Sequence, residues 1–282
     1  MRNCLPTVVE AETPVTVAET DVAALSFRGV RQTFMKPDGQ TAMPILSDIS
    51  FDVPSGKFVS IIGPSGCGKS TLVQMAAGLL KPSSGKVFHN GRAVVSVNSQ
   101  IGFVPQQAQL LPWKTMIENV EFPLLLRNVE SKERRARARE VITKVDLNGF
   151  EDHYPYQLSG GMQKRASIAR MLVHRPDTIL MDEPFGALDA QTRMVMQDDL
   201  QAMLETENSS VLFVTHDITE AVILSDTVVV MSRRPARILA EISIDLARPR
   251  NVFEPHASPG FSEAYDKVWS EFRNQLKPSR TA

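Results

Sequence analysis

Hydrophobic residues fall into short, regularly spaced runs from Leu25 onward, and their spacing predicts strands near the start of this region. Segment 25–34 has the composition of a strand. In segment 45–53 apolar and polar residues alternate, which predicts a strand buried on one face. Segment 58–63 is apolar throughout, as expected for a strand buried on both faces.

The rest of the chain alternates between helical stretches and further apolar runs. Helices are expected at 69–77, 115–127, 131–147 and 159–174. The second of these begins with a capping box, Thr115 followed three residues later by Glu118. Strands are expected within 178–184, 209–217 and 226–232. This alternation predicts a parallel sheet with crossovers, interrupted by a helical insert.

The composition of the 282 residues excludes several classes of protein. Lys and Arg number 31 against 32 Asp and Glu, and the net charge of -1 argues against a general nucleic-acid binder. Cys4 and Cys67 are too few for a disulfide framework or a four-ligand zinc site. No apolar run reaches the ~20 residues that span a bilayer and no secretory signal is recognised, so a cytosolic chain is expected. Residues 1–24, acidic and rich in proline, are expected to form a disordered tail.

Residues 63–71, GPSGCGKST, match the phosphate-loop pattern G-x-x-x-x-G-K-[ST]. Glycines let successive backbone N–H groups point at one anion, and the helix that starts near Lys69 adds the positive end of its dipole. The Lys69 ammonium suits the β- and γ-phosphates of a nucleotide, and the Ser70 hydroxyl is a hard oxygen ligand for Mg²⁺. The loop follows a buried strand and opens a helix, which is the context that supports nucleotide binding.

Two carboxylates, Asp182 and Glu183, follow the apolar run that starts at Thr178. At a strand end Asp182 suits a second-shell or water-mediated contact to Mg²⁺. Glu183, one residue on, could polarise a water for attack on the γ-phosphate. Downstream of a phosphate loop, this pair predicts nucleotide hydrolysis.

Segment 158–162, LSGGM, places Ser159 and two glycines at a helix start, where the hydroxyl and the N–H groups form an anion site. One subunit does not need two helix N-termini for the same γ-phosphate. We therefore expect two copies of the chain to clamp one ATP, with the phosphate loop of one facing the Ser159 helix of the other.

The motifs GPSGCGKST, LSGGM, ILMDEP, ALD and VTHD, in this order, resemble the nucleotide-binding subunit of an ABC transporter. The resemblance covers roughly Leu25 to Asp245, the size of one such domain. It implies an α/β fold, a P-loop NTPase ABC cassette with a RecA-like core, an antiparallel β subdomain and a helical subdomain. The chain would then divide into a tail at 1–24, an ATP-binding domain at 25–245 and a C-terminal extension at 246–282, which contains an amphipathic helix.

The same resemblance assigns roles to individual residues. The expected catalytic residues are Glu183 as general base, His216 as the switch that senses the γ-phosphate, and Lys69. The expected Mg²⁺-binding residues are Ser70, Gln106 and Asp182. The expected ATP-binding residues are Phe34, Gly63, Pro64, Ser65, Gly66, Cys67, Gly68, Lys69, Ser70, Thr71, Gln106, Ser159, Gly160, Gly161 and Asp189. Among these, Phe34 would stack on adenine and Asp189 would lie at the dimer seam.

Four segments are similar to one subgroup, the ATPases of bacterial importers for nitrate, taurine and aliphatic sulfonates: LSGGM, LLPW at 110–113, DEPFGALDAQTR, and SRRPARI at 232–238. Met162 stands where many family members have Gln, a position not expected to contact the γ-phosphate, so ATPase activity is expected to survive. The resemblance implies ATP and Mg²⁺ as cofactors and a peripheral place on the cytoplasmic face of the bacterial inner membrane. It also implies a second copy of the chain and integral membrane permease subunits as partners, with a periplasmic solute-binding protein delivering a small anion.

Two other functions are compatible with a phosphate loop. A soluble ABC ATPase acting on nucleic acid or ribosomes usually carries two cassettes, a long coiled coil or a zinc hook, and this sequence shows one cassette and no sustained heptads. A small-molecule P-loop kinase would leave Ser159 and His216 without a role. The basic residues of helix 131–147 are interpreted as a solvated face, and no nucleic-acid partner is expected.

Two segments are expected to make contacts of their own. The loop around Gln106 and Trp113 is expected to dock a short helix of the permease, with packing of Trp113 into its own subdomain as the alternative. In the C-terminal extension, Ser258 and Pro259 are expected to start a helix. Its apolar stripe is expected to pack foremost on its own domain, with the partner subunit and a membrane surface as alternatives. The stripe consists of Phe261, Ala264, Tyr265, Val268, Trp269, Phe272 and Leu276.

Overall fold

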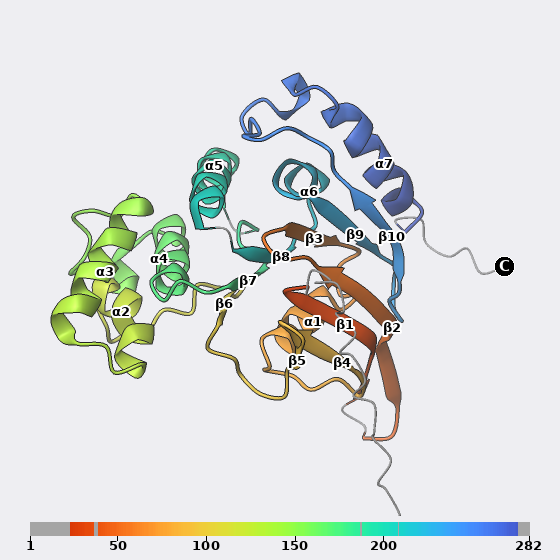
Figure 1. Cartoon of the computed structure of the whole chain (residues 1–282), viewed down its shortest axis with the longest axis horizontal. Coiled ribbons are helices and arrows are strands. Elements are labelled where there is room, and N and C mark those ends of the chain that lie inside the picture. Colours follow the sequence, from red (N-terminus) through yellow and green to blue (C-terminus); the bar gives the residue numbers. More distant parts are fainter. Residues whose placement is uncertain (1–22, 37–38, 187, 208, 276–282) are drawn as a thin grey trace, which may run out of the picture.

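The computed structural model describes residues 23–36, 39–186, 188–207 and 209–275, and it contains two β-sheets and a group of helices that projects to one side (Figure 1). The larger sheet lies at the centre of an α/β core, and the smaller, antiparallel sheet lies beside it. These are the three parts that the sequence predicts. Residues 1–22 of the tail expected at 1–24 lie outside the described residues, as does Leu276, the last apolar residue of the C-terminal stripe.

The central sheet has the strand order β10-β9-β3-β8-β7-β6. Its strands are β3 (Phe58–Ile62), β6 (Ile101–Val104), β7 (Thr178–Asp182), β8 (Ser210–Val214), β9 (Thr227–Met231) and β10 (Ile238–Ser243). The five strands from β9 to β6 run parallel, and β10 pairs with β9 antiparallel. Every residue of β3, β7 and β8 is buried, as their continuous apolar runs predict.

The antiparallel sheet has the order β2-β1-β4-β5. Its strands are β1 (Leu25–Met35), β2 (Ala42–Val53), β4 (Ser84–His89) and β5 (Arg92–Ala93). The predicted alternation is present in β2, where Ile49, Phe51 and Val53 are buried and the residues between them are exposed. Ala24, expected in the tail, is instead buried, and its carbonyl accepts a hydrogen bond from the Asn90 N–H at 3.0 Å.

The helical group contains α2 (Met116–Leu126), α3 (Ser131–Lys144), the 3-10 turn η1 (Pro155–Gln157) and α4 (Gly160–Leu172). The capping box at the start of α2 is confirmed, because the Glu118 N–H donates to Thr115 Oγ1 and the Thr115 N–H donates to Glu118 Oε2, at 3.4 and 2.9 Å. On the basic face of α3, Arg134 and Arg135 approach the carboxylate of Glu121 at 3.7 and 3.4 Å. Part of the positive charge on this face is therefore balanced by a carboxylate of the same helical group.

The remaining helices are α1 (Lys69–Ala76), α5 (Ala190–Glu207), α6 (Ile218–Leu224) and α7 (Phe261–Arg273), with the 3-10 turn η2 (Pro255–Ala257) before α7. Helix α7 lies along the outside of α6 and of strands β9 and β10 (Figure 1). Phe261, Val268 and Phe272 are buried in the same cluster as residues of α6, whereas Trp269 remains 38% exposed. The stripe thus packs on its own domain.

The expected start of this helix at Ser258 is wrong. Ser258 follows η2, and α7 begins at Phe261 after Gly260, whose φ of 83° lies in the left-handed region that favours glycine. The strands β4, β5, β6 and β10 were also not expected. Two of them are very short, and β10 alternates between half-buried and exposed residues at the sheet edge, so none presents a strong apolar run.

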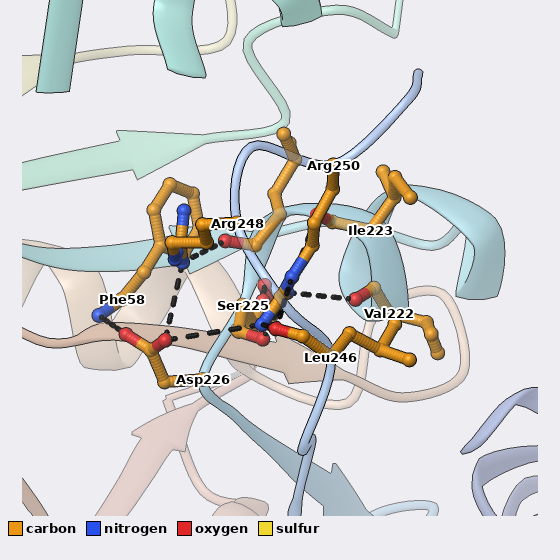
Figure 2. A network of polar contacts seen from close by, with 10 residues as sticks. Phe58, Val222, Ile223, Ser225, Asp226, Leu246, Arg248 and Arg250 are labelled. Atoms are coloured by element: carbon orange, nitrogen blue, oxygen red, sulfur yellow. Dashed lines mark hydrogen bonds and ion pairs between the residues drawn. The ribbon is translucent and has the colours of Figure 1, made fainter. Parts of the chain in front are cut away.

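A buried arginine ties the C-terminal extension to the core (Figure 2). Arg250 is 3% exposed, and its guanidinium donates to the carbonyl oxygens of Leu246 and of three residues at the end of α6, Val222, Ile223 and Ser225, at 2.6–3.3 Å. These carbonyls include groups that a helix C-terminus leaves without partners. Burial lowers the pKa of Arg250 to about 10.

The carboxylate of Asp226 lies near the Arg250 guanidinium. It approaches Arg250 at 3.9 Å and Arg248 at 3.2 Å, and it accepts a hydrogen bond from the Phe58 N–H of β3 at 2.9 Å (Figure 2). The carbonyl of Arg250 itself accepts from Gln201 Nε2 of α5 at 3.0 Å. We call Gln201, Asp226 and Arg250, with the carbonyls they bind, the arginine knot. It joins α5, α6 and β3 to the chain that follows β10.

Candidate active site

Several of the predicted site residues lie at the carboxyl ends of three neighbouring strands. Residues 63–71 follow β3, Glu183 follows β7, and His216 follows β8, which lies between them in the sheet. The carboxyl ends of parallel strands meet at one edge, where open α/β sheets bind their ligands. The fold therefore brings the phosphate loop, the two carboxylates and the histidine together from sequence positions more than a hundred residues apart.

The phosphate loop has the backbone that its glycines permit. Gly66 and Gly68 have φ of 73° and 113°, and a Cβ on Gly68 would lie 2.7 Å from the Leu46 side chain. The Lys69 ammonium is 5% exposed and donates to the carbonyl of Gly63 at 2.9 Å. Cys67 is buried within the loop, and this burial raises the pKa of its thiol. The Cys67 side chain therefore fills space inside the loop.

Ser70 and Asp182 form the first polar pair of the site. The Ser70 hydroxyl donates to Asp182 Oδ1 at 2.9 Å, so the start of α1 is joined to the end of β7. Burial raises the pKa of Asp182, while the hydrogen bond from Ser70 acts in the opposite direction. The hydroxyl and carboxylate oxygens of this pair are hard ligands, the type that Mg²⁺ prefers.

Glu183 is the point where two further predicted residues converge. Its Oε2 lies 3.3 Å from Gln106 Nε2, which donates to it, and 3.3 Å from His216 Nδ1. Glu183 has φ of 44°, an uncommon backbone conformation for a side chain of this size. This contact shows that the Gln106 side chain faces Glu183.

The segment that carries His216 is held by a buried carboxylate. Glu220 of α6 accepts from the Thr215 hydroxyl and from Gln197 Nε2 of α5, the latter at 2.9 Å. Glu220 is 6% exposed, and burial raises its pKa. Asp217 caps α6 by accepting from the N–H groups of Thr219 and Glu220. His216 therefore lies between two residues, Thr215 and Asp217, whose side chains are held by hydrogen bonds.

A cavity of about 260 Å³ opens beside the phosphate loop. Phe34, which is 36% exposed, lines it together with Lys69 and Glu183. Arg234, from the loop between β9 and β10, also lines it. Arg234 was not among the expected site residues, and the only signal was its place in the segment SRRPARI.

Lys164 is a second residue that sequence reasoning missed. It lies in α4, is 5% exposed, and donates to the carbonyls of Pro105 and Gln106 at 2.6 and 2.9 Å. Burial lowers its pKa to about 8. Lys164 therefore fixes the backbone that carries Gln106 to the helical group.

The structure does not bring Ser159, Gly160 and Gly161 to the phosphate loop of the same chain. They lie at the start of α4, which Figure 1 shows well apart from α1. Ser159 caps α4, with its hydroxyl accepting from the Met162 N–H at 3.3 Å. Asp189 plays the same part for α5, accepting from the Thr192 N–H at 3.1 Å. Neither residue is among those that line the cavity beside Lys69.

These features together define a P-loop ATPase of the cassette type. The chain belongs to the ABC transporter family, whose model matches residues 46–186. No helix in the described part of the chain is long and apolar enough to cross a membrane.

Individual relatives extend the similarity over most of the chain. An uncharacterised ABC transporter ATP-binding protein of Methanocaldococcus jannaschii is 49% identical over 83% of this chain and 86% of its own. A taurine import ATP-binding protein of Rhizobium johnstonii is 44% identical over 79% and 87%, and an aliphatic sulfonates import ATP-binding protein of Bacillus thuringiensis is 39% identical over 89% and 96%. A dimeric ATP-binding cassette solved after hydrolysis with ADP and Pi superposes with a TM-score of 0.71 at 33% identity, covering 78% of this chain and 98% of that one.

Proposed function

We propose that this chain is the ATP-hydrolysing subunit of a bacterial importer for a small anion such as taurine, an aliphatic sulfonate or nitrate. The observation that supports hydrolysis is the convergence of Gln106 and His216 on the Glu183 carboxylate, next to the phosphate loop. The names of the taurine and aliphatic sulfonate relatives support the import of a sulfonate-like anion.

In the proposed mechanism the N–H groups of residues 63–71 and the Lys69 ammonium bind the β- and γ-phosphates of ATP. Glu183 accepts a proton from the water that attacks the γ-phosphate, and His216 holds this carboxylate in place through the 3.3 Å contact. Phe34 lines the same cavity and offers an aromatic face to the adenine.

The donor set also fits Mg²⁺. Ser70 and Asp182 supply two adjacent oxygens, and Gln106 approaches the same region through Glu183. Among the described residues, no group of three His, Cys, Asp or Glu side chains is placed to hold a metal, so these few ligands suit an ion that keeps waters and phosphate oxygens. When bound, Mg²⁺ would neutralise charge on the phosphates.

A second copy of the chain would complete the site. Ser159, Gly160 and Gly161 present a helix N-terminus that the same chain's phosphate loop does not use. The dimeric state of the similar cassette supports two such chains, each donating its Ser159 helix to the other's ATP, with Asp189 near the seam.

The permease would dock on the loop that follows Gln106. Trp113 is 71% exposed, which argues against its packing into its own helical subdomain, and exposed aromatic anchors are enriched at the centres of interfaces. This contact would hold the chain at the cytoplasmic face of the inner membrane. A periplasmic binding protein would deliver the anion to the permease.

Reconstitution with the permease in vesicles tests this proposal. Wild-type chain should couple ATP hydrolysis to uptake of the anion, and Glu183→Gln should bind ATP without turnover. Trp113→Ala should lose uptake while keeping the ATPase activity of the isolated subunit, with Trp269→Ala as a control at an exposed tryptophan of α7. Unchanged turnover in Glu183→Gln would contradict the assigned base, and unchanged uptake in Trp113→Ala would contradict the docking site.

A further inference from the structure

Arg234 places a second cation in the nucleotide cavity, outside the motifs that define the family. It lines the cavity together with Phe34, Met43 and Lys69. Its Nε donates to the carbonyl of Gly66 in the phosphate loop, and its Nη1 lies 3.9 Å from Met43 Sδ. Met43 is the register partner of Phe34 in the β1–β2 pair. The guanidinium therefore extends from the phosphate loop to the aromatic side of the cavity.

The backbone of this loop is anchored beside the cavity. The Ala236 N–H donates to the Ile45 carbonyl at 2.8 Å, and the Ser47 N–H donates to the Ala236 carbonyl at 2.9 Å. These two bonds attach the loop after β9 to β2, whose residues Met43 and Ile45 line the cavity. Arg234 then packs over Gly66, where a Cβ would lie 3.0 Å from Nη2. Its position is set by main-chain contacts on one side and by a glycine on the other.

The two cations of the cavity differ in what they can recognise. Lys69 is a compact charge buried at the phosphate end, where it binds loop carbonyls. A guanidinium is planar and weakly hydrated, and it stacks on aromatic faces as well as donating hydrogen bonds. Arg234 is exposed and lies beside Met43, the register partner of Phe34, so the chemistry it adds suits a nucleobase more than a phosphate.

We propose that Arg234 contacts the nucleoside part of bound ATP, with the adenine held between its guanidinium and the Phe34 ring. This inference rests on the proposed ATP site. It makes Arg234 a binding residue for the base, acting in the same chain as the phosphate loop. Lys69 would then bind the phosphates and Arg234 would bind the base.

Calorimetric titration of the full chain with Mg–ATP and with Mg–tripolyphosphate, which lacks the nucleoside, separates the two contributions. Arg234→Ala should weaken ATP binding about tenfold, the equivalent of ~1.4 kcal/mol, and leave tripolyphosphate binding unchanged. Arg234→Lys should recover only part of the loss, because the ammonium lacks the planar face. Arg237→Ala, an exposed arginine of the same loop, is the matched control and should bind both ligands as wild type does.

Two results would overturn the proposal: unchanged ATP binding in Arg234→Ala, or an equal loss of ATP and tripolyphosphate binding, which would make Arg234 a phosphate ligand. Lys69→Ala keeps this test separate from the proposed function, because it should lose both ligands. Failure of Lys69→Ala to affect either ligand would contradict the phosphate-loop assignment, whatever Arg234 does.

Discussion

Lys69 and Arg250 are both buried cations that bind backbone carbonyls, but the regions around them differ. Lys69 donates to Gly63 and Pro64 at 2.9 and 3.4 Å and borders a cavity of about 260 Å³. Arg250 donates to the carbonyls of four residues and lies near the Asp226 carboxylate. The first cation can exchange its partners for a ligand, whereas the second is held by the fold. Burial of a charge alone therefore does not mark a binding site, and the neighbouring space decides its role.

The largest expected effect is at the cavity. Lys69→Ala should lower ATP turnover by at least about 10²–10³-fold, because it removes the charge that stabilises the transferring phosphoryl group. Its unfolding free energy should change little, since Lys69 borders the cavity and water can take the place of its ammonium beside the loop carbonyls. Steady-state ATPase assays and urea denaturation measure the two quantities. A variant that loses stability and activity in parallel would break the distinction between Lys69 and Arg250.

The arginine knot should respond in the opposite way. Arg250→Ala should lower the unfolding free energy by about 3 kcal/mol, because it leaves several buried carbonyls without their donor and removes one ion-pair partner of Asp226. Arg248→Ala is the matched control, since Arg248 contacts the same carboxylate from a more exposed position and should cost less than about 1 kcal/mol. Urea denaturation measures both variants. Equal losses would show that the buried guanidinium has no special role.

His174 tests partial burial outside the nucleotide cavity. Burial, aided by the Arg127 guanidinium, lowers its pKa to about 4, so the folded chain keeps the ring neutral where the unfolded chain binds a proton. Stability from this group is complete above pH 6.5 and is lost as the pH falls toward 4. The unfolding free energy should fall by roughly 1 kcal/mol between pH 7 and pH 5, after allowance for solvent screening. In His174→Gln this part of the pH dependence should disappear, and an identical pH profile would count against the assignment.

The smallest effect is expected at the edge of the knot. Gln201→Leu removes the donor to the Arg250 carbonyl, but it also removes Gln201 Oε1, a buried oxygen without a hydrogen-bond partner among the described residues. The two terms oppose each other, so the unfolding free energy should change by less than about 1 kcal/mol. Denaturation curves beside those of Arg250→Ala check this. A loss of unfolding free energy as large as that of Arg250→Ala would show that Gln201 contributes as much stability as Arg250.

The parts of the fold that the sequence predicted are those with local signals. The buried strand β3, the phosphate loop and the capping box of α2 each rest on residues a few positions apart. Asp182 and Glu183 could be placed at a strand end for the same reason. Strands β6 and β10 were missed, because their form depends on partners distant in sequence.

Arg234 and Lys164 escaped prediction for a related reason. Each reaches its partners across the fold, Arg234 to Gly66 and Lys164 to Pro105, and no spacing in the sequence records such contacts. The prediction of the start of α7 was wrong for a different reason. Ser258 has a favoured capping side chain, yet the left-handed conformation at Gly260 sets the first turn.

The order of strands in the central sheet has a consequence for how the chain is made. Strand β8 lies between β3 and β7 but is synthesised after both, and β9, the other neighbour of β3, comes later still. A nascent chain that has emerged only as far as residue 186, the end of the segment matched by the family model, has β3 and β7 with no strand to join them. Contacts between distant segments form slowly and leave apolar strands exposed meanwhile. The nucleotide site can therefore close only when the ribosome has delivered β8 and the histidine that follows it.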